Sequence, residues 1–286
     1  MDTTVKDEGG QEDRTENSRH PGRRPTIALS AHWQTYPDRF GWIVDHGFAA
    51  EYTPNPEALD DLPRHVAPFL VAGIPVRYHG FFPKHEIGHR DRAMAERALQ
   101  VQMAALEAMV GRGEQVITAH IGLDGEVPLD RGRAAENLAR LVARADELGI
   151  AVCLENLRRG PTSDPETVLE WARASGAMIT LDVGHAVSCQ RVQNGELTAL
   201  DFVEAFADRL LEVHMYEREA DRHYPPQDMT VLGPIVDRLL VTACTWWTIE
   251  LSDTAEALAT RALLLEHITR FQSIAQSLLA QSDDPK

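Results

Sequence analysis

The chain has 286 residues, of which 43% are hydrophobic and 25% are charged, and its formal net charge at pH 7 is −16. This composition is that of a globular protein and excludes a collagen-like or wholly disordered chain. No apolar run approaches the roughly 18 residues of a membrane span, and the excess of acids disfavours a long basic groove for nucleic acid. The three cysteines include no CxxC pair, so neither a disulfide framework nor a thiolate metal site is predicted.

The first segment, residues 1–25, has no apolar core and therefore lacks the signature of a signal peptide. It mixes acidic and basic residues without any hydrophobic periodicity. These features predict a disordered tail on a cytoplasmic protein. One folded domain is expected to follow over residues 26–280.

Eight short apolar runs rich in β-forming residues alternate with longer helical patterns along this domain. The helical pattern is clearest over residues 91–113 and 133–149. Asp164 followed by Pro165 predicts the start of another helix, with Asp164 as its N-cap. The candidate strands are 26–32, 48–53, 75–80, 115–122, 150–157, 178–186, 210–217 and 245–253.

The alternation of strands and helices determines the predicted fold class. Strands separated by helices imply right-handed βαβ units and a parallel sheet. Eight such units predict an α/β protein with a single (β/α)8 TIM barrel. An open doubly wound sheet is the alternative, but the GxGxxG signature that usually follows its first strand is absent.

Histidines and carboxylates recur where the candidate strands end, which is the functional face of such a barrel. Glu155 and Asp182 follow apolar residues, and an unpaired buried charge is costly. Converging carboxylates repel one another unless cations neutralise them, and imidazole with carboxylate suits Zn²⁺, Mn²⁺ or Fe²⁺. A single strand-end histidine is more often structural, but the joint pattern predicts a polynuclear metal site. The strand ends and the loops after them carry His32, Glu51, His79, His120, Glu155, Asp182, His185, His214, Asp221, His223 and Glu250.

The pieces Glu155-Asn156-Leu157, Asp182-x-x-His185 and Asp221-x-His223, in this order, resemble the xylose isomerase-like barrel superfamily. Within it, the chain is similar to the endonuclease IV branch, AP endonuclease family 2, from about residue 26 to residue 275. His32 in Ser-Ala-His also resembles the first-strand histidine of that branch. The resemblance implies up to three zinc ions, with Glu155 bridging the first two. The other implied ligands are His79 and His120 for the first ion, Asp182, His214 and Glu250 for the second, and His185, Asp221 and His223 for the third.

Two stretches depart from the endonuclease IV pattern, namely Met-Tyr-Glu after His214 and Gly-Phe-Phe-Pro after His79. The run Asp-Arg-His-Tyr-Pro-Pro, followed by Leu-Gly-Pro-Ile-Val-Asp, is similar to barrels described as sugar phosphate isomerases or epimerases. The departures favour a small phosphorylated metabolite over DNA as the substrate. Epimerases of the superfamily hold one metal with four ligands, which match Glu155, Asp182, His214 and Glu250.

The first functional hypothesis is a metal-dependent hydrolase of phosphoester bonds, in which a clustered metal site supplies hydroxide at neutral pH. Glu155 would bridge the cluster, and Glu250 would position the nucleophile. Arginines near the metal-bearing strands could clamp an anionic substrate. The predicted substrate-binding residues are His32, Glu51, Arg158 and Arg222. Aromatic residues expected as a wedge into abasic DNA, or as walls of a small-molecule pocket, are Trp33, Tyr36, Phe81 and Phe82.

The alternative is a single-metal sugar or sugar-phosphate isomerase or epimerase that uses Glu155 and Glu250 as an acid–base pair. A third hypothesis is a metal-binding barrel without turnover, which the complete ligand set disfavours. The expected cofactor is a divalent metal, Zn²⁺ first and Mn²⁺ or Fe²⁺ next. The expected partner is an anionic or sugar-like small molecule, with DNA a weaker expectation. No sequence feature predicts an oligomeric state.

Overall fold

A computed structural model of the protein describes residues 24–282. Eight long strands form one closed barrel, and all neighbouring strands in it are parallel. The predicted (β/α)8 barrel is therefore confirmed, whereas the tail predicted over residues 1–25 lies outside the described residues except for its last two. The barrel strands are β1 (Thr26–His32), β2 (Ala49–Thr53), β3 (Val76–Gly80), β4 (Val116–Ala119), β5 (Ala151–Glu155), β6 (Met178–Asp182), β7 (Leu210–Met215) and β10 (Trp246–Ile249).

The strands follow one another around the barrel in the order β1–β10–β7–β6–β5–β4–β3–β2. Every residue of β2, β3 and β4 is buried, because both faces of a barrel strand are covered. Each barrel strand begins at the predicted residue or one residue later. Strands β4, β5, β6, β7 and β10 end two to four residues before the predicted ends, because the chain turns there into the loops above the barrel.

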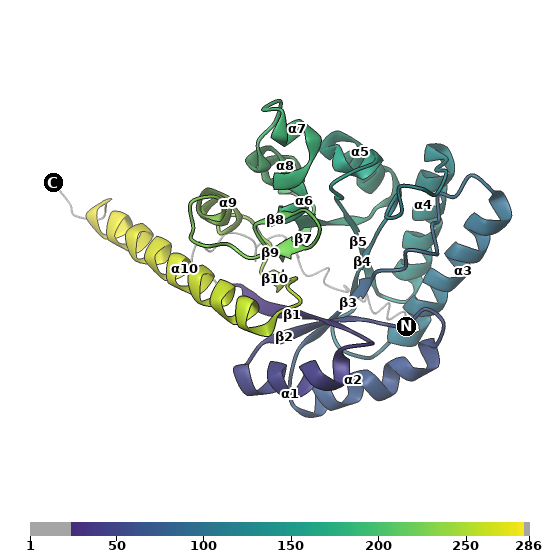
Figure 1. Ribbon diagram of the computed structural model, residues 1–286, viewed down its shortest axis with the longest axis horizontal. Coiled ribbons are helices and arrows are strands. Elements are labelled where there is room, and N and C mark those ends of the chain that lie inside the picture. Colours follow the sequence, from purple (N-terminus) through teal and green to yellow (C-terminus); the bar gives the residue numbers. More distant parts are fainter. Residues whose placement is uncertain (1–23, 283–286) are drawn as a thin grey trace, which may run out of the picture.

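Helices surround the barrel (Figure 1). The helices predicted over 91–113 and 133–149 are present, and Gly111 and Gly113, both at positive φ, follow the first of them. Among residues 24–282, no helix combines the length and apolarity needed to cross a membrane. The main helices are α1 (Tyr36–His46), α2 (Leu62–Val71), α3 (Arg92–Met109), α4 (Arg131–Glu147), α5 (Pro165–Ser175), α8 (Ala199–Phe206), α9 (Leu232–Leu239) and α10 (Thr254–Ser282). The shorter ones are η1 (Leu59–Asp61), η2 (Pro161–Ser163), α6 (Val183–Ser188) and α7 (Gln190–Gln193).

The start of α5 differs in one detail from its prediction. Pro165 is its first residue and Asp164 occupies the N-cap position, as expected. The Asp164 carboxylate, however, makes no cap hydrogen bond to the helix backbone. It accepts a hydrogen bond from the Thr167 hydroxyl and pairs with the Arg191 guanidinium instead.

Apolar side chains pack between the strands and the surrounding helices, whereas polar side chains fill part of the barrel interior. The Thr118 and Thr180 hydroxyls are 2.7 Å apart, and the Thr248 hydroxyl donates to Glu212 at 2.9 Å. The Arg77 guanidinium lies 3.6 Å from the other oxygen of Glu212. This interior network supports the strand ends at which the functional side chains stand.

A short antiparallel hairpin follows β7 and consists of β8 (Arg218–Glu219) and β9 (His223–Tyr224). Glu219 pairs directly with His223, so the side chains of these two residues lie on the same face of the hairpin. Asp221 lies in the turn between the two strands. The pairing in the hairpin therefore places Glu219, and not Asp221, beside His223.

Candidate metal centre

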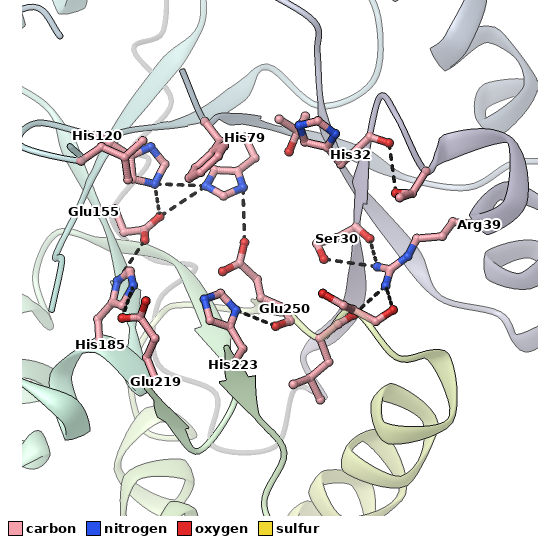
Figure 2. A pocket seen from close by; sticks show the side chains of 16 residues that line it. Ser30, His32, Arg39, His79, His120, Glu155, His185, Glu219, His223 and Glu250 are labelled. Carbon is pink, nitrogen blue, oxygen red and sulfur yellow. Dashed lines mark hydrogen bonds and ion pairs between the residues drawn. The ribbon is translucent and has the colours of Figure 1, made fainter. Parts of the chain in front are cut away.

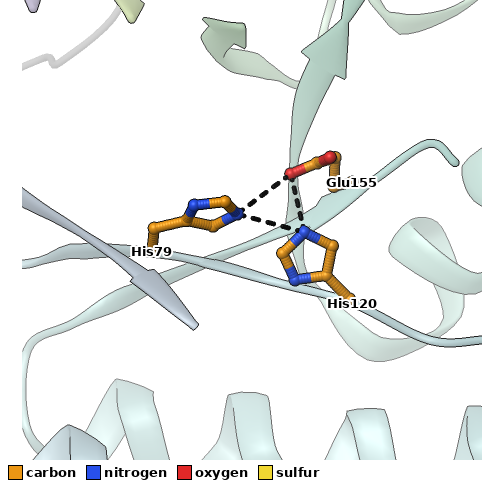
Figure 3. Close-up of side chains that lie close together, drawn as sticks. All are labelled: His79, His120 and Glu155. Atoms are coloured by element: carbon orange, nitrogen blue, oxygen red, sulfur yellow. Dashed lines mark hydrogen bonds and ion pairs between the residues drawn. The ribbon is translucent and has the colours of Figure 1, made fainter. Parts of the chain in front are cut away.

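Three strand ends bring His79, His120 and Glu155 together on the interior side of β3, β4 and β5 (Figure 3). The two Nε2 atoms of the histidines are 3.1 Å apart. Glu155 Oε2 lies 3.0 Å from His120 Nε2 and 3.6 Å from His79 Nε2. These three side chains, all buried, present two nitrogens and one oxygen to a common point.

A second group shares Glu155 and adds Asp182, His214 and Glu250 from β6, β7 and the end of β10. His214 Nδ1 lies 3.2 Å from Glu155 Oε2 and 3.5 Å from Glu250 Oε2. Asp182 accepts hydrogen bonds from the His185 backbone N–H and the Tyr216 hydroxyl. The four groups predicted for a single-metal centre are thus brought together.

A third group consists of His185, Glu219 and His223 and is partly open to solvent. His185 Nε2 lies 3.3 Å from Glu219 Oε2. The structure does not bring Asp221 into this group, contrary to the ligand set predicted from the sequence. Asp221 is exposed and accepts a hydrogen bond from the Tyr224 hydroxyl, because the hairpin places it in the turn.

His120 and His214 each have one ring nitrogen held by an acceptor outside the cluster and the other directed into it. His120 Nδ1 donates to the Gly80 carbonyl at 3.2 Å, and His214 Nε2 donates to Glu51 at 3.0 Å. His79 Nδ1 lies 3.3 Å from Glu250 Oε1. This arrangement leaves a lone pair on the inner nitrogen, as is typical of metal-ligating histidines.

The third group follows the same rule. His185 Nδ1 donates to the Asn156 carbonyl at 2.9 Å, and His223 Nδ1 donates to the Glu250 carbonyl at 2.8 Å. A carbonyl oxygen only accepts, so both Nδ1 atoms carry a proton and both Nε2 atoms are free to bind a ligand. Tyr216 stacks on the His223 ring with a centroid separation of 3.9 Å and fixes its plane.

Two buried atoms at the centre of the site lack a hydrogen bond among the described residues, namely Glu155 Oε2 and His214 Nδ1. In the neutral imidazole that donates to Glu51, Nδ1 carries a lone pair, and it faces carboxylate oxygens of Glu155 and Glu250. Lone pairs facing one another repel unless a cation lies between them. The donor set of imidazole and carboxylate fits a divalent metal such as Zn²⁺, Mn²⁺ or Fe²⁺.

The pKa values of these groups reflect the same crowding of charge. Burial, together with the charges of Glu155 and Glu250, raises the pKa of Asp182 to about 6 against the opposing effect of His185. Burial alone would lower the pKa of His214, but Glu250, Glu51 and Glu155 outweigh it and raise that pKa well above its ordinary value. The pKa of His185 is likewise raised, because Asp182, Glu155 and Glu219 outweigh its burial. Without a metal, protons bound to these groups therefore neutralise part of the negative charge.

Glu155 behaves in the opposite way. Burial alone would raise its pKa, but the imidazoles of His120 and His214 outweigh that effect and hold the pKa well below its ordinary value. The pKa of Glu250 is also lowered, because His214 and His79 outweigh its burial. Both glutamates are therefore ionised at neutral pH and able to bind a cation or accept a proton.

A cavity of about 450 Å³ opens above the cluster (Figure 2). Its volume is within the range of small-molecule sites. His79, His120, Glu155, His185 and Glu250 line it, whereas Asp182 and His214 lie fully buried beneath. A molecule that enters the cavity therefore meets the five lining side chains, whereas Asp182 and His214 are not exposed to it.

The four predicted substrate-binding residues divide between cavity and surroundings. His32 lines the cavity, whereas Glu51 is fully buried behind His214. Arg158 pairs with Glu219 at 3.1 Å and helps to hold the hairpin. Arg222 is exposed and forms a bidentate ion pair with Glu256, so the structure does not place it at the cavity.

Two charged residues that line the cavity, Glu219 and Arg39, were not predicted from the sequence. Glu219 could have been identified from a hairpin that pairs it with His223. Arg39 projects from α1, where no strand-end rule applies, and donates to the carbonyls of Ser30 and Leu251. It thereby joins the ends of β1 and β10 at the cavity edge, and its charge has no carboxylate hydrogen-bond partner among the described residues.

Comparison with known proteins agrees with this architecture. Residues 22–267 match the sequence profile of the family described as xylose isomerase-like TIM barrel. The chain belongs to this family. The superfamily predicted from the sequence is therefore confirmed, and members of this superfamily are enzymes that bind divalent metals. An uncharacterized protein of Methanocaldococcus jannaschii is 35% identical over 168 residues, which are 58% of this chain and 72% of that protein.

Solved structures with the same fold include two proteins described as sugar epimerases or as similar to one. A D-tagatose 3-epimerase-like protein has 16% identity and a TM-score of 0.72, with 87% of this chain and 99% of that chain covered. An L-ribulose 3-epimerase has 16% identity and a TM-score of 0.71, with 92% and 100% covered. At this identity, the likeness shows that this xylose isomerase-like chain shares their fold.

The competing assignments of the hairpin acid lead to a direct prediction. If the group of His185, Glu219 and His223 binds an ion of its own, Glu219→Gln is expected to lower the bound metal by about one equivalent per chain, because a carboxamide is a poor ligand beside two imidazoles. Asp221→Asn, the matched control two residues away, is expected to leave the metal content unchanged. Elemental analysis of both variants checks this, and equal losses in the two variants would contradict the assignment of Glu219.

Proposed function

We propose that this protein is a metal-dependent isomerase or epimerase that acts on a sugar or a sugar phosphate. The observation that carries the proposal is the placement of two ionised glutamates in one cavity. Glu155 and Glu250 both line it, and both approach the same atom, His214 Nδ1, at 3.2 and 3.5 Å. The shared fold of the two epimerase structures supports this choice over a hydrolase.

Epimerisation next to a carbonyl requires one group to remove a proton from carbon and another to return it on the opposite face. A divalent ion held by Glu155, Asp182, His214 and Glu250 would bind adjacent substrate oxygens and acidify that C–H bond. The carboxylate of one of the two, Glu155 or Glu250, would accept the proton from carbon. The other glutamate, ionised at rest, would take a proton from solvent and return it to the opposite face of the same carbon. Asn156 assists by holding the backbone of Asp182 in place through two hydrogen bonds of 2.9 Å.

The test is solvent exchange in heavy water. Metal-loaded protein incubated with ketoses and ketose phosphates is expected to place deuterium on the carbon next to the carbonyl and to form the epimer or aldose, both visible by NMR. Glu250→Gln is expected to slow this exchange by about 10²- to 10⁴-fold, the usual contribution of a general base. Glu256→Gln, which breaks only the surface pair with Arg222, is the control. Absence of exchange across the whole panel contradicts the proposal.

A second candidate function is the hydrolysis of a phosphoester, in a small metabolite or in abasic DNA. The observation that favours it is the number of ligand-type side chains beyond the four that one metal needs. Further ligand-type side chains lie near Glu155 and Glu250 and form two additional candidate groups. They are supplied by His79, His120, His185, Glu219 and His223.

Metal content separates the two candidates. Protein purified without chelator is expected to hold about one equivalent of metal as a single-metal isomerase and roughly two to three as a phosphoesterase. In the second case, His79→Ala is expected to remove about one equivalent, because it dismantles the group shared with His120 and Glu155. An unchanged metal content in His79→Ala would count against the phosphoesterase.

A further inference from the structure

A second cavity, of about 290 Å³, adjoins the one above the metal ligands. The two cavities share His32 and Phe81 among their lining residues. Trp33, Phe82 and Lys84 line only the second cavity, which we call the aromatic chamber. A molecule that extends from the first cavity past His32 and Phe81 would therefore contact the walls of both cavities.

Two rings that line the aromatic chamber, those of Phe81 and Trp33, remain partly open to solvent, whereas a third, that of Phe82, is buried. Phe81 is 40% exposed, although its ring lies close to the imidazoles of His79 and His120, with centroid separations of 6.1 and 6.0 Å. Trp33 is half-buried and lies 5.5 Å from the His32 ring. Open aromatic faces beside a functional cavity suit the face of a ring in a ligand. Tyr36, by contrast, packs against Phe69 and His65 and does not line the chamber.

His32 stands at the border of the two cavities and presents a hydrogen-bond donor there. The backbone N–H of Gln34 donates to His32 Nδ1 at 3.2 Å, so the proton of the neutral ring is on Nε2. No residue between 24 and 282 accepts a hydrogen bond from that Nε2. Figure 2 shows His32 next to His79 at the edge of the cavity above the candidate metal ligands.

We infer that the substrate is a molecule of two rings joined through an oxygen, that is, a glycoside. Its reacting sugar, which carries the carbonyl that the proposed proton transfer requires, lies in the cavity above the candidate metal ligands. Its second ring lies in the aromatic chamber, and His32 Nε2 donates to the oxygen between them. The inference rests on the proposed function, in which the reacting unit is a sugar. It adds a second recognition site that a free monosaccharide would leave empty.

The test compares two probes that differ only in the second ring, phenyl β-D-glucopyranoside and methyl β-D-glucopyranoside. Calorimetry on the metal-loaded protein is expected to show about tenfold tighter binding of the phenyl probe, the upper end for one aromatic contact. Phe81→Ala and Trp33→Ala are expected to bring the ratio close to one. Leu258→Ala, which removes an apolar side chain of equal exposure on α10, is expected to leave the ratio unchanged. A wild-type ratio near one overturns the inference.

The role of His32 has a separate signature. Both probes carry the linking oxygen, so His32→Ala is expected to weaken both by a similar factor, about fivefold for one hydrogen bond. The phenyl-to-methyl ratio is expected to stay at its wild-type value. Unchanged affinities in His32→Ala would contradict the assigned donor.

Acetylation of Lys84 provides a readout that does not depend on turnover. The modified peptide is easily assigned, because Lys84 is the only lysine between residues 24 and 282. Its rate of acetylation by an N-hydroxysuccinimide ester, followed by peptide mapping, is expected to fall with the phenyl probe and not with the methyl probe. Protection of Lys84 without exchange in heavy water would support the chamber and contradict the proposed function. Exchange with monosaccharides but no protection by the phenyl probe would overturn the inference alone. Binding of neither probe, with Lys84 unprotected, also overturns it.

Discussion

Glu155→Gln is expected to lower turnover by about three orders of magnitude while leaving the barrel folded. Glu155 belongs to both buried ligand groups, and its Oε2 lies within 3.6 Å of ring nitrogens from His79, His120 and His214. Glutamine has the same shape, but its carboxamide neither binds a divalent ion well nor accepts a proton from carbon. The substitution therefore removes metal binding and proton transfer together.

The measurement pairs activity in the exchange assay with the thermal transition and with elemental analysis. Glu86→Gln is the matched control, because Glu86 is also buried and accepts hydrogen bonds from the backbone N–H groups of Gly88 and Gly122. Glu86 does not line the metal cavity, so its substitution is expected to alter stability but not turnover per folded molecule. A fully active Glu155→Gln protein would contradict both candidate functions, since both depend on this carboxylate.

The architecture and the position of the site were predictable because they depend on local patterns. A parallel barrel strand is a short apolar run, and its last residue is the one that faces the functional end. The residues that end β5 and β6, that lie one position before the ends of β3 and β7, or that follow β4 and β10 were therefore identified without any knowledge of tertiary contacts. They are His79, Glu155, Asp182, His214, His120 and Glu250, and the structure brings all six together.

The acid beside His223 depended on a feature that periodicity does not reveal. The motif Asp221-x-His223 resembles that of the endonuclease IV branch, and this resemblance favoured Asp221. The chain instead reverses between β8 and β9, so the residue on the same face is Glu219, four positions before His223. The same reversal leaves Arg222 at the surface, where Glu256 pairs with it.

Glu51 shows that a position in sequence does not give a depth in the barrel. It was expected to bind substrate, but it lies in the middle of β2, two residues before the strand ends at Thr53. At that depth, Glu51 is fully buried and accepts the Nε2–H of His214. Glu51 therefore orients His214, a candidate metal ligand, and predicting this role requires knowing how β2 and β7 align across the barrel.

Removal of the bound metal is expected to lower the melting temperature by about 5–10 °C near pH 8. A metal present at about 100 times its dissociation constant stabilises the folded state by about 2.7 kcal/mol. Each kcal/mol shifts the transition of a domain of this size by about 2–4 °C. The physical source of the stabilisation is the buried cluster of Glu155, Asp182 and Glu250, whose charges repel one another without a cation.

The difference between metal-loaded and metal-free protein is expected to shrink as the pH falls to about 5.5. The pKa of Asp182 is raised to about 6, and the pKa values of His185 and His214 are raised well above their ordinary value. A raised pKa in the folded state means that protonation stabilises the metal-free protein at low pH and that this stabilisation is lost as the pH rises through the raised value. Glu155 and Glu250, whose pKa values are lowered, titrate below this window.

Protons and metal therefore compete for the same side chains. Scanning calorimetry of the metal-loaded and the metal-free protein between about pH 5.5 and 8 measures this competition as a difference in melting temperature. Asp182→Asn is expected to weaken the pH dependence of the melting difference around pH 6, since it removes a buried carboxyl whose pKa is raised to about 6. A melting difference that stays constant with pH, or narrows as the pH rises, would contradict metal binding by Asp182, His185 and His214. If the cation binds the groups that lose these protons, the difference in melting temperature between metal-loaded and metal-free protein is expected to increase with pH.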